Sequence, residues 1–240
     1  MNDKATHHTL ALISNVTHQA INPLNGVIGT LDNIIDGTIS SERRDQRIRS
    51  ARSQLEYTVS LIRNLAYFAQ YGINSNVSPK FKENKICVIP QVLIEAAQFF
   101  QEQGASHGIR IEVENRWEQN AVKGDPDLLR QVFMNIFDNF IKYGYEHSLV
   151  EIKQWIQKRS KTLIVTITGQ SAVFEPEEDI FGLGIRGRAA KEKTSAGSGL
   201  GLHICKLIVD RLFKGNISAS YSRDHKTAEF VIRIPNAFSI

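Results

Sequence analysis

The stretch LALISNVTHQAINPLNGVIGTLDNII, residues 10–35, decides the fold of the N-terminal part of this chain. Its apolar and small residues recur at steps of three and four, the spacing of a helix that packs lengthwise against other helices. These seam positions are Leu10, Ile13, Thr17, Ala20, Leu24, Val27, Leu31 and Ile34. His18 follows the seam by one position, so we expect it at the rim of a helical bundle, reachable from solvent. Pro23 lacks an amide hydrogen and predicts a bend one turn later. The alternative is that His18 is an ordinary surface residue.

A second helix is predicted over residues 42–71, after a break at Gly37 and a capping serine at position 40 or 41. Its seam has the same spacing and consists of Ile48, Ala51, Leu55, Thr58, Ile62, Leu65 and Ala69. Two long helices joined by a short turn form an antiparallel hairpin. Because a hairpin leaves much of each seam uncovered, we expect two copies to form a four-helix bundle, and therefore a homodimer.

The composition excludes several classes of protein. The chain has 240 residues, 42% of them hydrophobic, and a net charge of +4 with basic and acidic residues interspersed, so no nucleic-acid-binding stripe is indicated. Cys87 and Cys205 lie far apart inside apolar patterns, which predicts buried thiols rather than a disulfide or metal site. No run approaches 18 apolar residues and the N-terminus is polar, so we expect a cytoplasmic protein without membrane insertion.

The domain organisation follows from a run of turn residues. Residues 1–72 are predicted to form the helical hairpin, residues 73–84 a linker, and residues 85–240 a second domain. In that domain we expect helices at 90–104, 126–143 and 200–213, and strands at 85–88, 109–115, 148–155, 162–168, 215–221 and 227–234. The predicted class is α+β: a helical hairpin followed by an α/β sandwich with helices on one face of the sheet.

The predicted helix at 126–143 carries polar residues on a face of its own. Its apolar stripe faces the core, whereas Asn135, Asn139 and Lys142 recur at i, i+4 and i+7. An amide oxygen can ligate Mg²⁺, and a lysine at the helix end can neutralise phosphate charge. The alternative is a solvated polar face without a ligand.

A glycine-rich stretch, GSGLGL at residues 197–202, precedes the last predicted helix. Glycines allow backbone amides to approach phosphate oxygens, and the N-terminus of the following helix favours an anion. Taken alone, three glycines also make an ordinary flexible loop. Together with the Asn/Lys face they predict a nucleotide site.

These motifs together resemble those of the sensor histidine kinases of two-component systems. HQAINPL, residues 18–24, is similar to the phospho-acceptor box HExxxPL, and QVFMNIFDNFIKYG, residues 131–144, to the N-box QVLxNLLxNAxKYT. GSGLGL is similar to the G2 box, and Ile180-Phe181 with Arg186-Gly187 to the F-box IFxPFxRG. The resemblance covers residues 9–235. It implies a dimerising phosphotransfer hairpin followed by an ATP-binding domain of the Hsp90, gyrase and MutL type.

The resemblance implies an ATP-dependent protein-histidine kinase of a phosphorelay. His18 would be phosphorylated with ATP and Mg²⁺, and the phosphoryl group would pass to an aspartate in the receiver domain of a separate response regulator. Asn139 would hold the metal. Nucleotide contacts would come from Asn135, Lys142, Tyr143, Arg186, Gly197, Gly199, Leu200 and Gly201. The input signal would come from a separate sensor protein or from a preceding segment.

Two departures from the family pattern affect the chemistry. Gln19 replaces the acidic residue after the histidine, which predicts slower phosphorylation of His18, although Gln19 and Asn22 could position a water that dephosphorylates a partner. After the strand at 162–168 the family has DxGxG, whose aspartate accepts a hydrogen bond from the adenine amino group; here the chain reads TGQSAV, residues 168–173. Losing that acceptor weakens adenine binding by about 1–3 kcal/mol, unless Thr168 or Gln170 supplies a substitute. Gly182-Leu183-Gly184 also replaces Glu-Pro-Phe of the F-box.

These departures leave two alternatives to the kinase. One is an ATP-independent histidine phosphotransferase, pseudokinase or response-regulator phosphatase on the same fold. The other is a scaffolding dimer without chemistry.

Overall fold

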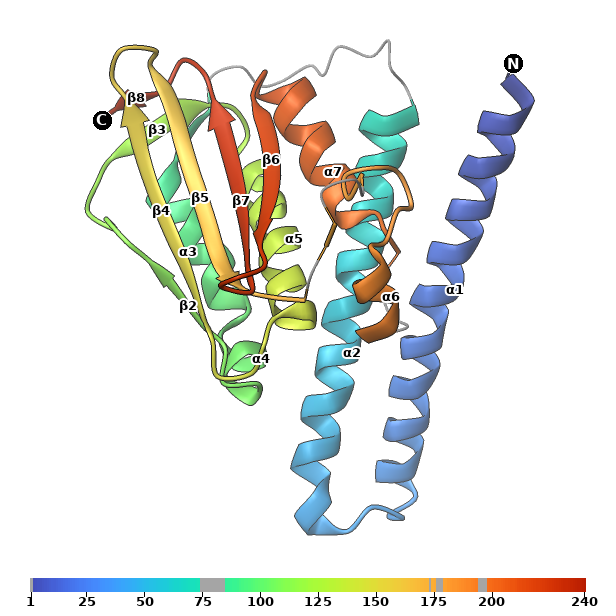
Figure 1. Cartoon of the computed structure of the whole chain (residues 1–240). Coiled ribbons are helices and arrows are strands. Elements are labelled where there is room, and N and C mark those ends of the chain that lie inside the picture. The colour runs from blue at the N-terminus through green and yellow to red at the C-terminus, as the bar shows by residue number, and fades with distance from the viewer. Residues whose placement is uncertain (1, 74–84, 173, 176–178, 194–197) are drawn as a thin grey trace.

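The N-terminal part of the molecule is an antiparallel helical hairpin (Figure 1). The structure, a computed structural model, describes residues 2–73, 85–172, 174–175, 179–193 and 198–240, with all side chains except those of residues 2–12, 15, 102, 189–190 and 193. Helix α1 (Asn2–Ile35) contains Pro23, and helix α2 (Ser41–Tyr67) continues as a π-helical segment, Phe68–Ile73. The hairpin confirms the prediction for this part of the chain. Most of the predicted linker lies outside the described residues.

The hairpin buries few of its apolar side chains within one chain. Among the side chains that the structure describes, the buried ones are Val16, Ala20, Val27, Ala51 and Leu61, with Phe68 in the π-helical segment. Large apolar side chains at exposed positions form a second set: Ile21, Ile28, Leu31, Ile35, Ile48, Leu55, Val59 and Ile62. Four predicted seam residues, Leu31, Ile48, Leu55 and Ile62, are therefore uncovered in the single chain.

Residues 85–240, here called the C-terminal part, are built on a five-stranded sheet in the order β2-β4-β5-β7-β6. Strand β2 is parallel to β4, and the other neighbours are antiparallel. The strands are β2 (Arg110–Val113), β4 (Leu149–Gln157), β5 (Thr162–Gln170), β7 (Thr227–Ile234) and β6 (Asn216–Ser222). Burial alternates along β5 and β7, as expected for a sheet with one face on the core.

A small second sheet and the helices complete the C-terminal part. The sheet pairs β1 (Ile86–Val88), β3 (Asn120–Lys123) and β8 (Phe238–Ser239) in antiparallel fashion. The helices are α3 (Ile89–Phe99), α4 (Gln101–Ser106), α5 (Pro126–Tyr143), α6 (Arg188–Lys193) and α7 (Gly201–Leu207), the last continued by a π-helical segment, Ile208–Leu212. Helices α3, α5 and α7 cover one face of the large sheet (Figure 1). The α+β class is thus confirmed.

Several predicted elements were wrong in their limits. The helix expected at 90–104 is divided, because Phe100 leaves the helical angles (φ −94°, ψ 3°) and buries its ring against Phe137, 6.4 Å between centroids. The helix expected at 200–213 is α-helical only over α7. Strands β3 and β8 and helix α6 were not predicted.

Helix α5 has the predicted bounds, and the sequence sets both ends. The Asp125 carboxylate accepts a hydrogen bond from the Asp127 amide at 3.2 Å, and Pro126 occupies the first turn, where its missing N–H costs nothing. At the other end the Gly144 amide donates to the Phe140 carbonyl oxygen. A Cβ at position 144 would lie 2.2 Å from that oxygen, so only glycine fits there without a shift.

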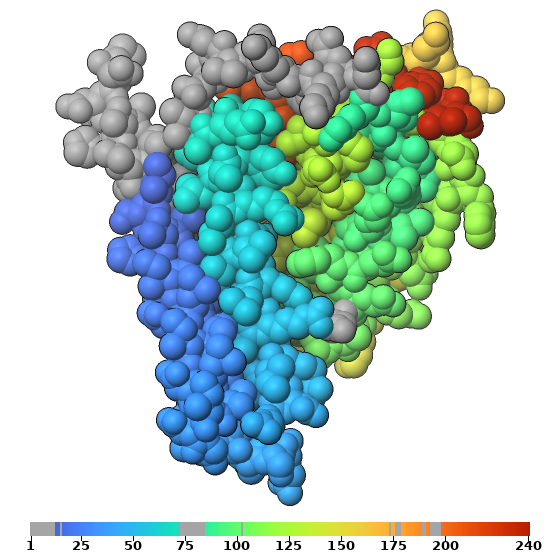
Figure 2. All heavy atoms as spheres, turned by 180° about the vertical axis from the view of Figure 1, so that it is seen from behind, coloured from blue at the N-terminus to red at the C-terminus, as the bar shows by residue number. Residues whose placement is uncertain are grey.

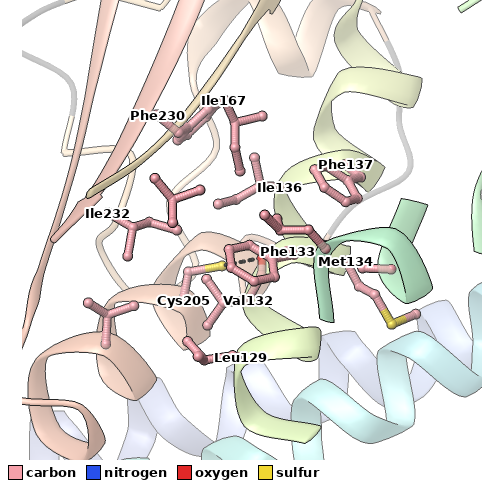
Figure 3. Close-up of a cluster of buried hydrophobic side chains, with 14 of the residues drawn as sticks. Leu129, Val132, Phe133, Met134, Ile136, Phe137, Ile167, Cys205, Phe230 and Ile232 are labelled. Atoms are coloured by element: carbon pink, nitrogen blue, oxygen red, sulfur yellow. Dashed lines mark hydrogen bonds between the residues drawn. The ribbon is translucent and has the colours of Figure 1, made fainter. Parts of the chain in front are cut away.

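The core lies between α5 and the large sheet (Figure 3). Leu129, Phe133 and Phe137 of α5 are fully buried, and they face Ile167 of β5 and side chains of β7. Both cysteines are buried and free, as predicted, and burial raises the pKa of each thiol to about 12.

Replacing Phe133 by Ala should destabilise the protein by about 3–5 kcal/mol, because the ring is fully buried and its loss leaves a cavity. The control is Trp117→Ala, since Trp117 is 92% exposed and its truncation should change stability by less than about 0.5 kcal/mol. Urea unfolding followed by circular dichroism measures both. Equal effects of the two substitutions would contradict this placement of α5.

Candidate functional site: a cavity between helix α5, the glycine loop and helix α2

A cavity of about 130 Å³ opens beside α5 and gathers most of the residues predicted to bind nucleotide. Its wall from α5 includes Asn135, Asn139, Lys142 and Tyr143. A second wall, from residues 180–202, includes Arg186, Gly199 and Gly201. A third wall, here called the sheet wall, runs along the sheet. It consists of Phe140 of α5, which lies over β5, of Ser171, Ala172 and Phe174, which follow β5, and of Ala228 and Phe230 of β7. Helix α2 adds Tyr57, Ser60, Leu61 and Asn64, which were not predicted.

Asn135 is held in a buried cluster of amides. Its Nδ2 donates to the Asn64 side-chain oxygen at 3.1 Å and to the Gly201 carbonyl at 3.1 Å. Its Oδ1 accepts from Asn64 Nδ2 at 3.2 Å and from Gln131 Nε2 at 3.0 Å. Both lone pairs and both amide hydrogens of Asn135 are therefore used, and α2 is tied to α5 through the same side chain that was predicted to contact nucleotide.

Lys142 is also engaged by its surroundings. Its ammonium contacts the Asp138 carboxylate and lies 4.6 Å from the centroid of the Tyr57 ring of α2. Burial alone would lower the pKa of Lys142, but the Asp138 carboxylate outweighs it, so this pKa lies above its ordinary value. Lys142 therefore stays charged at neutral pH and can attract an anion.

Asn139 has the polar atom without a partner in this cavity. Its Nδ2 is buried and makes no hydrogen bond in the structure. A buried amide without an acceptor costs about 1–3 kcal/mol, which a ligand oxygen would recover. This orphaned donor fits an oxygen-rich ligand such as a nucleotide phosphate, while the amide oxygen of the same side chain is a ligand type that Mg²⁺ accepts.

Residues 198–202 of the glycine-rich stretch, here called the glycine loop, pack closely against the backbone of another segment. Gly199 has φ +68°, and a Cβ there would lie 2.6 Å from the Gly184 carbonyl carbon. The Gly184 amide donates to the Gly199 carbonyl at 3.2 Å. The glycines that replace the usual F-box residues thus allow this segment to pack against the glycine loop. The Leu200 side chain is fully buried, and its amide is bonded to Ser198 Oγ at 3.2 Å; Gly197 lies outside the described residues.

His203, near the start of α7, contacts the segment around Phe181, and the sequence did not predict this role. Its Nδ1 lies 3.0 Å from the Phe181 carbonyl oxygen. A carbonyl can only accept, so Nδ1 carries the hydrogen. Burial lowers the pKa of His203, which favours the neutral ring. No motif marked this residue, because its contact depends on the path of the chain between β5 and α7.

The phospho-acceptor candidates lie on α1, apart from this cavity. His18 and Asn22 are exposed, and Gln19 is half-buried. None of these three is among the residues that line the cavity. The structure therefore brings the predicted nucleotide residues together, but it does not bring His18 to them within one chain.

Comparison with known proteins gives a consistent picture. Residues 124–237 match the family described as histidine kinase-, DNA gyrase B- and HSP90-like ATPase. The sensor protein KdpD of Clostridium acetobutylicum is 26% identical over 201 residues, which are 83% of this chain and 22% of that protein. The histidine kinase BaeS of Escherichia coli is 25% identical over 212 residues, 88% of this chain and 43% of that protein. The chain thus spans less than half the length of either relative.

Solved structures of histidine kinases share the fold. The kinase AdeS of Acinetobacter baumannii superposes with a TM-score of 0.61 at 20% identity, covering 91% of this chain and 97% of that one. The kinase ThkA, solved in complex with the response regulator TrrA, superposes with a TM-score of 0.57 at 18% identity, covering 94% of this chain and 61% of that one. Among the described helices, none combines the length and apolar character needed to cross a bilayer. These matches support a sensor histidine kinase core: residues 124–237 are similar to the histidine kinase-, DNA gyrase B- and HSP90-like ATPases, and most of the chain is similar to sensor histidine kinases.

Proposed function

We propose that this chain is a protein-histidine kinase that phosphorylates His18 with Mg-ATP and passes the phosphoryl group to an aspartate of a separate response regulator. In this proposal residues 1–72 are the dimerisation and phosphotransfer domain, 73–84 the linker, and 85–240 the catalytic domain. The observation that carries it is the cavity in which Asn135, Asn139, Lys142 and the glycine loop converge, in a chain that also presents an exposed histidine on a long helix.

His18 is the proposed nucleophile. A neutral imidazole nitrogen can attack the terminal phosphorus of a nucleoside triphosphate; an N–P bond forms as the P–O bond to the leaving diphosphate breaks. The proton on the other ring nitrogen passes to solvent, because Gln19 has no carboxylate to receive it. Exposure of His18 allows both the catalytic domain and a partner protein to reach it.

The cavity residues would hold the phosphate end of the nucleotide. Lys142 would supply positive charge, the Nδ2 of Asn139 would donate to a phosphate oxygen, and Gly199, which lines the cavity, would contact a phosphate through its backbone. Arg186 and Tyr143, which also line the cavity, would contact the nucleotide. Mg²⁺, bound through the Asn139 oxygen, would supply charge neutralisation on the phosphates. Asn135 would contact the nucleotide by giving up its hydrogen bond to Asn64 or to the Gly201 carbonyl.

The acceptor of the phosphoryl group would be a receiver domain. Support comes from ThkA, a kinase of the same fold that is solved with a response regulator. Gln19 and Asn22 lie beside His18 on α1, where they could position a water that hydrolyses the phosphorylated partner.

A second candidate function is an ATP-independent histidine phosphotransferase or response-regulator phosphatase. The sheet wall of the cavity favours it, because the described residues of that wall include no carboxylate that could pair with adenine. In that case His18 would receive its phosphoryl group from a partner protein rather than from a nucleotide.

We infer that the hairpin forms a four-helix bundle in a homodimer. The exposed apolar side chains on both helices, Ile28 and Leu31 on α1 with Leu55 and Ile62 on α2 among them, would be covered by a second copy. A partner copy could also bring its own catalytic domain to His18.

Replacing His18 by Gln should remove acid-labile phosphate from the protein after incubation with Mg-ATP, since glutamine cannot form the N–P bond. The control is His225→Gln, because His225 is exposed in the turn between β6 and β7. The measurement uses ATP with a radioactive terminal phosphate and follows how much label stays on the protein after acid and after base treatment. Equal labelling of the two variants would contradict the role of His18.

Replacing Asn139 by Ala should weaken Mg-ADP binding at least about tenfold, because one charge-assisted hydrogen bond and the metal ligand are lost together. Asn216→Ala, at an exposed position of β6, is the matched control and should bind as the wild type does. Calorimetric titration gives both affinities. Unchanged binding by the Asn139 variant would place the nucleotide elsewhere.

Replacing Leu55 and Ile62 together by Glu should convert the protein to monomers, because the charges would be buried without partners in a bundle. The molar mass measured by light scattering should fall from twice the chain mass of 27.0 kDa to a single chain mass. The control is Trp117→Glu, which exchanges an exposed apolar side chain outside the hairpin. A monomeric wild type would rule out the bundle.

A further inference from the structure

In the sheet wall of the cavity, the ring of Phe140 occupies the space that a side chain at position 169 would otherwise take. Phe140, in the last turn of α5, lies directly over Gly169 of β5. A Cβ at position 169 would lie 2.9 Å from Cε1 and 3.1 Å from Cδ1 of that ring. Phe140 is 1% exposed, so its ring is buried at this position. Glycine at 169 and phenylalanine at 140 are therefore coupled: the ring is accommodated because the strand has no side chain there.

The neighbours of Phe140 make this wall apolar. Gly169 pairs with Ala228 on β7, a second small residue beside the ring. Phe230 meets Phe140 edge to face, 5.8 Å between centroids at 85°, and Phe174 lies 6.4 Å from Phe230. Three aromatic rings and two small residues thus form one packed surface.

The polar groups near this wall are already paired within the protein. The Ser171 hydroxyl lies 3.4 Å from the Tyr143 carbonyl oxygen and donates to it. The Ser171 amide donates to the Lys226 carbonyl, and its own carbonyl accepts from the Tyr221 hydroxyl at 3.2 Å. The Ala172 amide donates to the Tyr143 carbonyl at 2.8 Å. A nucleobase placed here would meet stacking and apolar surfaces, but no unpaired group among these to read its edge.

The groups suited to phosphate lie on the other walls. Lys142 is charged, Asn139 has its unpaired amide, and Gly199 presents its backbone, all from α5 or the glycine loop. These groups would contact the part of a nucleotide that is the same for every base. Recognition of the phosphates would then be separated from recognition of the base, and the described polar groups of the sheet wall named above are already paired.

We propose that Phe140, seated on Gly169, is the specificity-determining residue of this site and removes selection for adenine, so that the site takes nucleoside di- and triphosphates irrespective of the base. This inference rests on the proposed nucleotide-binding function and names its substrate class. An apolar surface discriminates weakly between ligands of similar shape, whereas a site that hydrogen-bonds one of them discriminates strongly. Adenine and guanine have similar shape but present an amino group and a carbonyl at the same ring position.

The test is calorimetric titration of the whole chain with Mg-ADP and, separately, with Mg-GDP. The two dissociation constants should agree within about threefold, because the phosphates supply the recognition. A preference of tenfold or more for either nucleotide would overturn the inference, while leaving the proposed kinase function intact.

A double variant tests the same assignment through a change in nucleotide preference. Phe140→Ala with Gly169→Asp opens the space above β5 and places a carboxylate in it. A carboxylate accepts from the adenine amino group and repels the guanine carbonyl, so this variant should prefer Mg-ADP over Mg-GDP by about tenfold or more. The control is Phe140→Ala alone, which opens the same space without an acceptor and should show no preference. Circular dichroism and thermal unfolding establish that both variants are folded.

The outcomes separate this inference from the proposed function. If the wild type binds neither nucleotide at millimolar concentration, the autokinase and this inference both fail. If the wild type binds both nucleotides about equally, the kinase proposal is kept, and a folded double variant without preference would contradict the role of Phe140 and Gly169. If the double variant does not fold, the ratio of the wild-type dissociation constants for Mg-ADP and Mg-GDP decides the test.

Discussion

The two-sided packing of α5 is the constraint on which the rest of the structure depends. One face of this helix supplies Leu129, Phe133 and Phe137 to the core against the large sheet. Another face supplies Asn135, Asn139 and Lys142 to the cavity. Because the core fixes the rotation of the helix about its axis, it also fixes where the polar side chains point. The packing of the core therefore sets the direction of these side chains, and hydrogen bonds from Asn64 of α2 and the Gly201 carbonyl then hold the Asn135 amide.

The same helix connects the hairpin to the cavity. Helix α2 lies between α1 and the C-terminal part, as both views of the molecule show (Figures 1 and 2). Asn64 and Tyr57 of α2 contact Asn135 and Lys142, so a ligand that uses these two α5 side chains has to compete with α2. If the cavity binds a ligand through these side chains, movement of the hairpin relative to the C-terminal part would be energetically linked to ligand binding.

The sequence predicts those features that depend on local patterns. The bounds of α5, the hairpin, and strand β7 follow from apolar spacing and from capping residues such as Asp125, Pro126 and Gly144. The convergence of Asn139 and Lys142 also follows, since helical spacing alone places them on one face. Strands β3 and β8 could not be predicted, because they are short and are defined by pairing with each other over a long separation. The amide cluster of Asn64, Gln131 and Asn135, the link from His203 to Phe181, and the contact of Phe140 with Gly169 likewise depend on tertiary packing. The sequence shows that the aspartate of the family pattern is absent from the stretch that begins at residue 168, but only the structure shows that the Phe140 ring lies over Gly169.

The central claim is that the cavity beside α5 holds the phosphates of a nucleotide through its asparagine side chains. The most direct measurement is to follow the side-chain amide signals of Asn135 and Asn139 by nitrogen–proton correlation NMR while Mg-ADP is added, with the exposed Asn216 as internal reference. The account predicts that both cavity signals shift and saturate together while the Asn216 signal stays in place. Cavity signals that remain unchanged at millimolar nucleotide would contradict it.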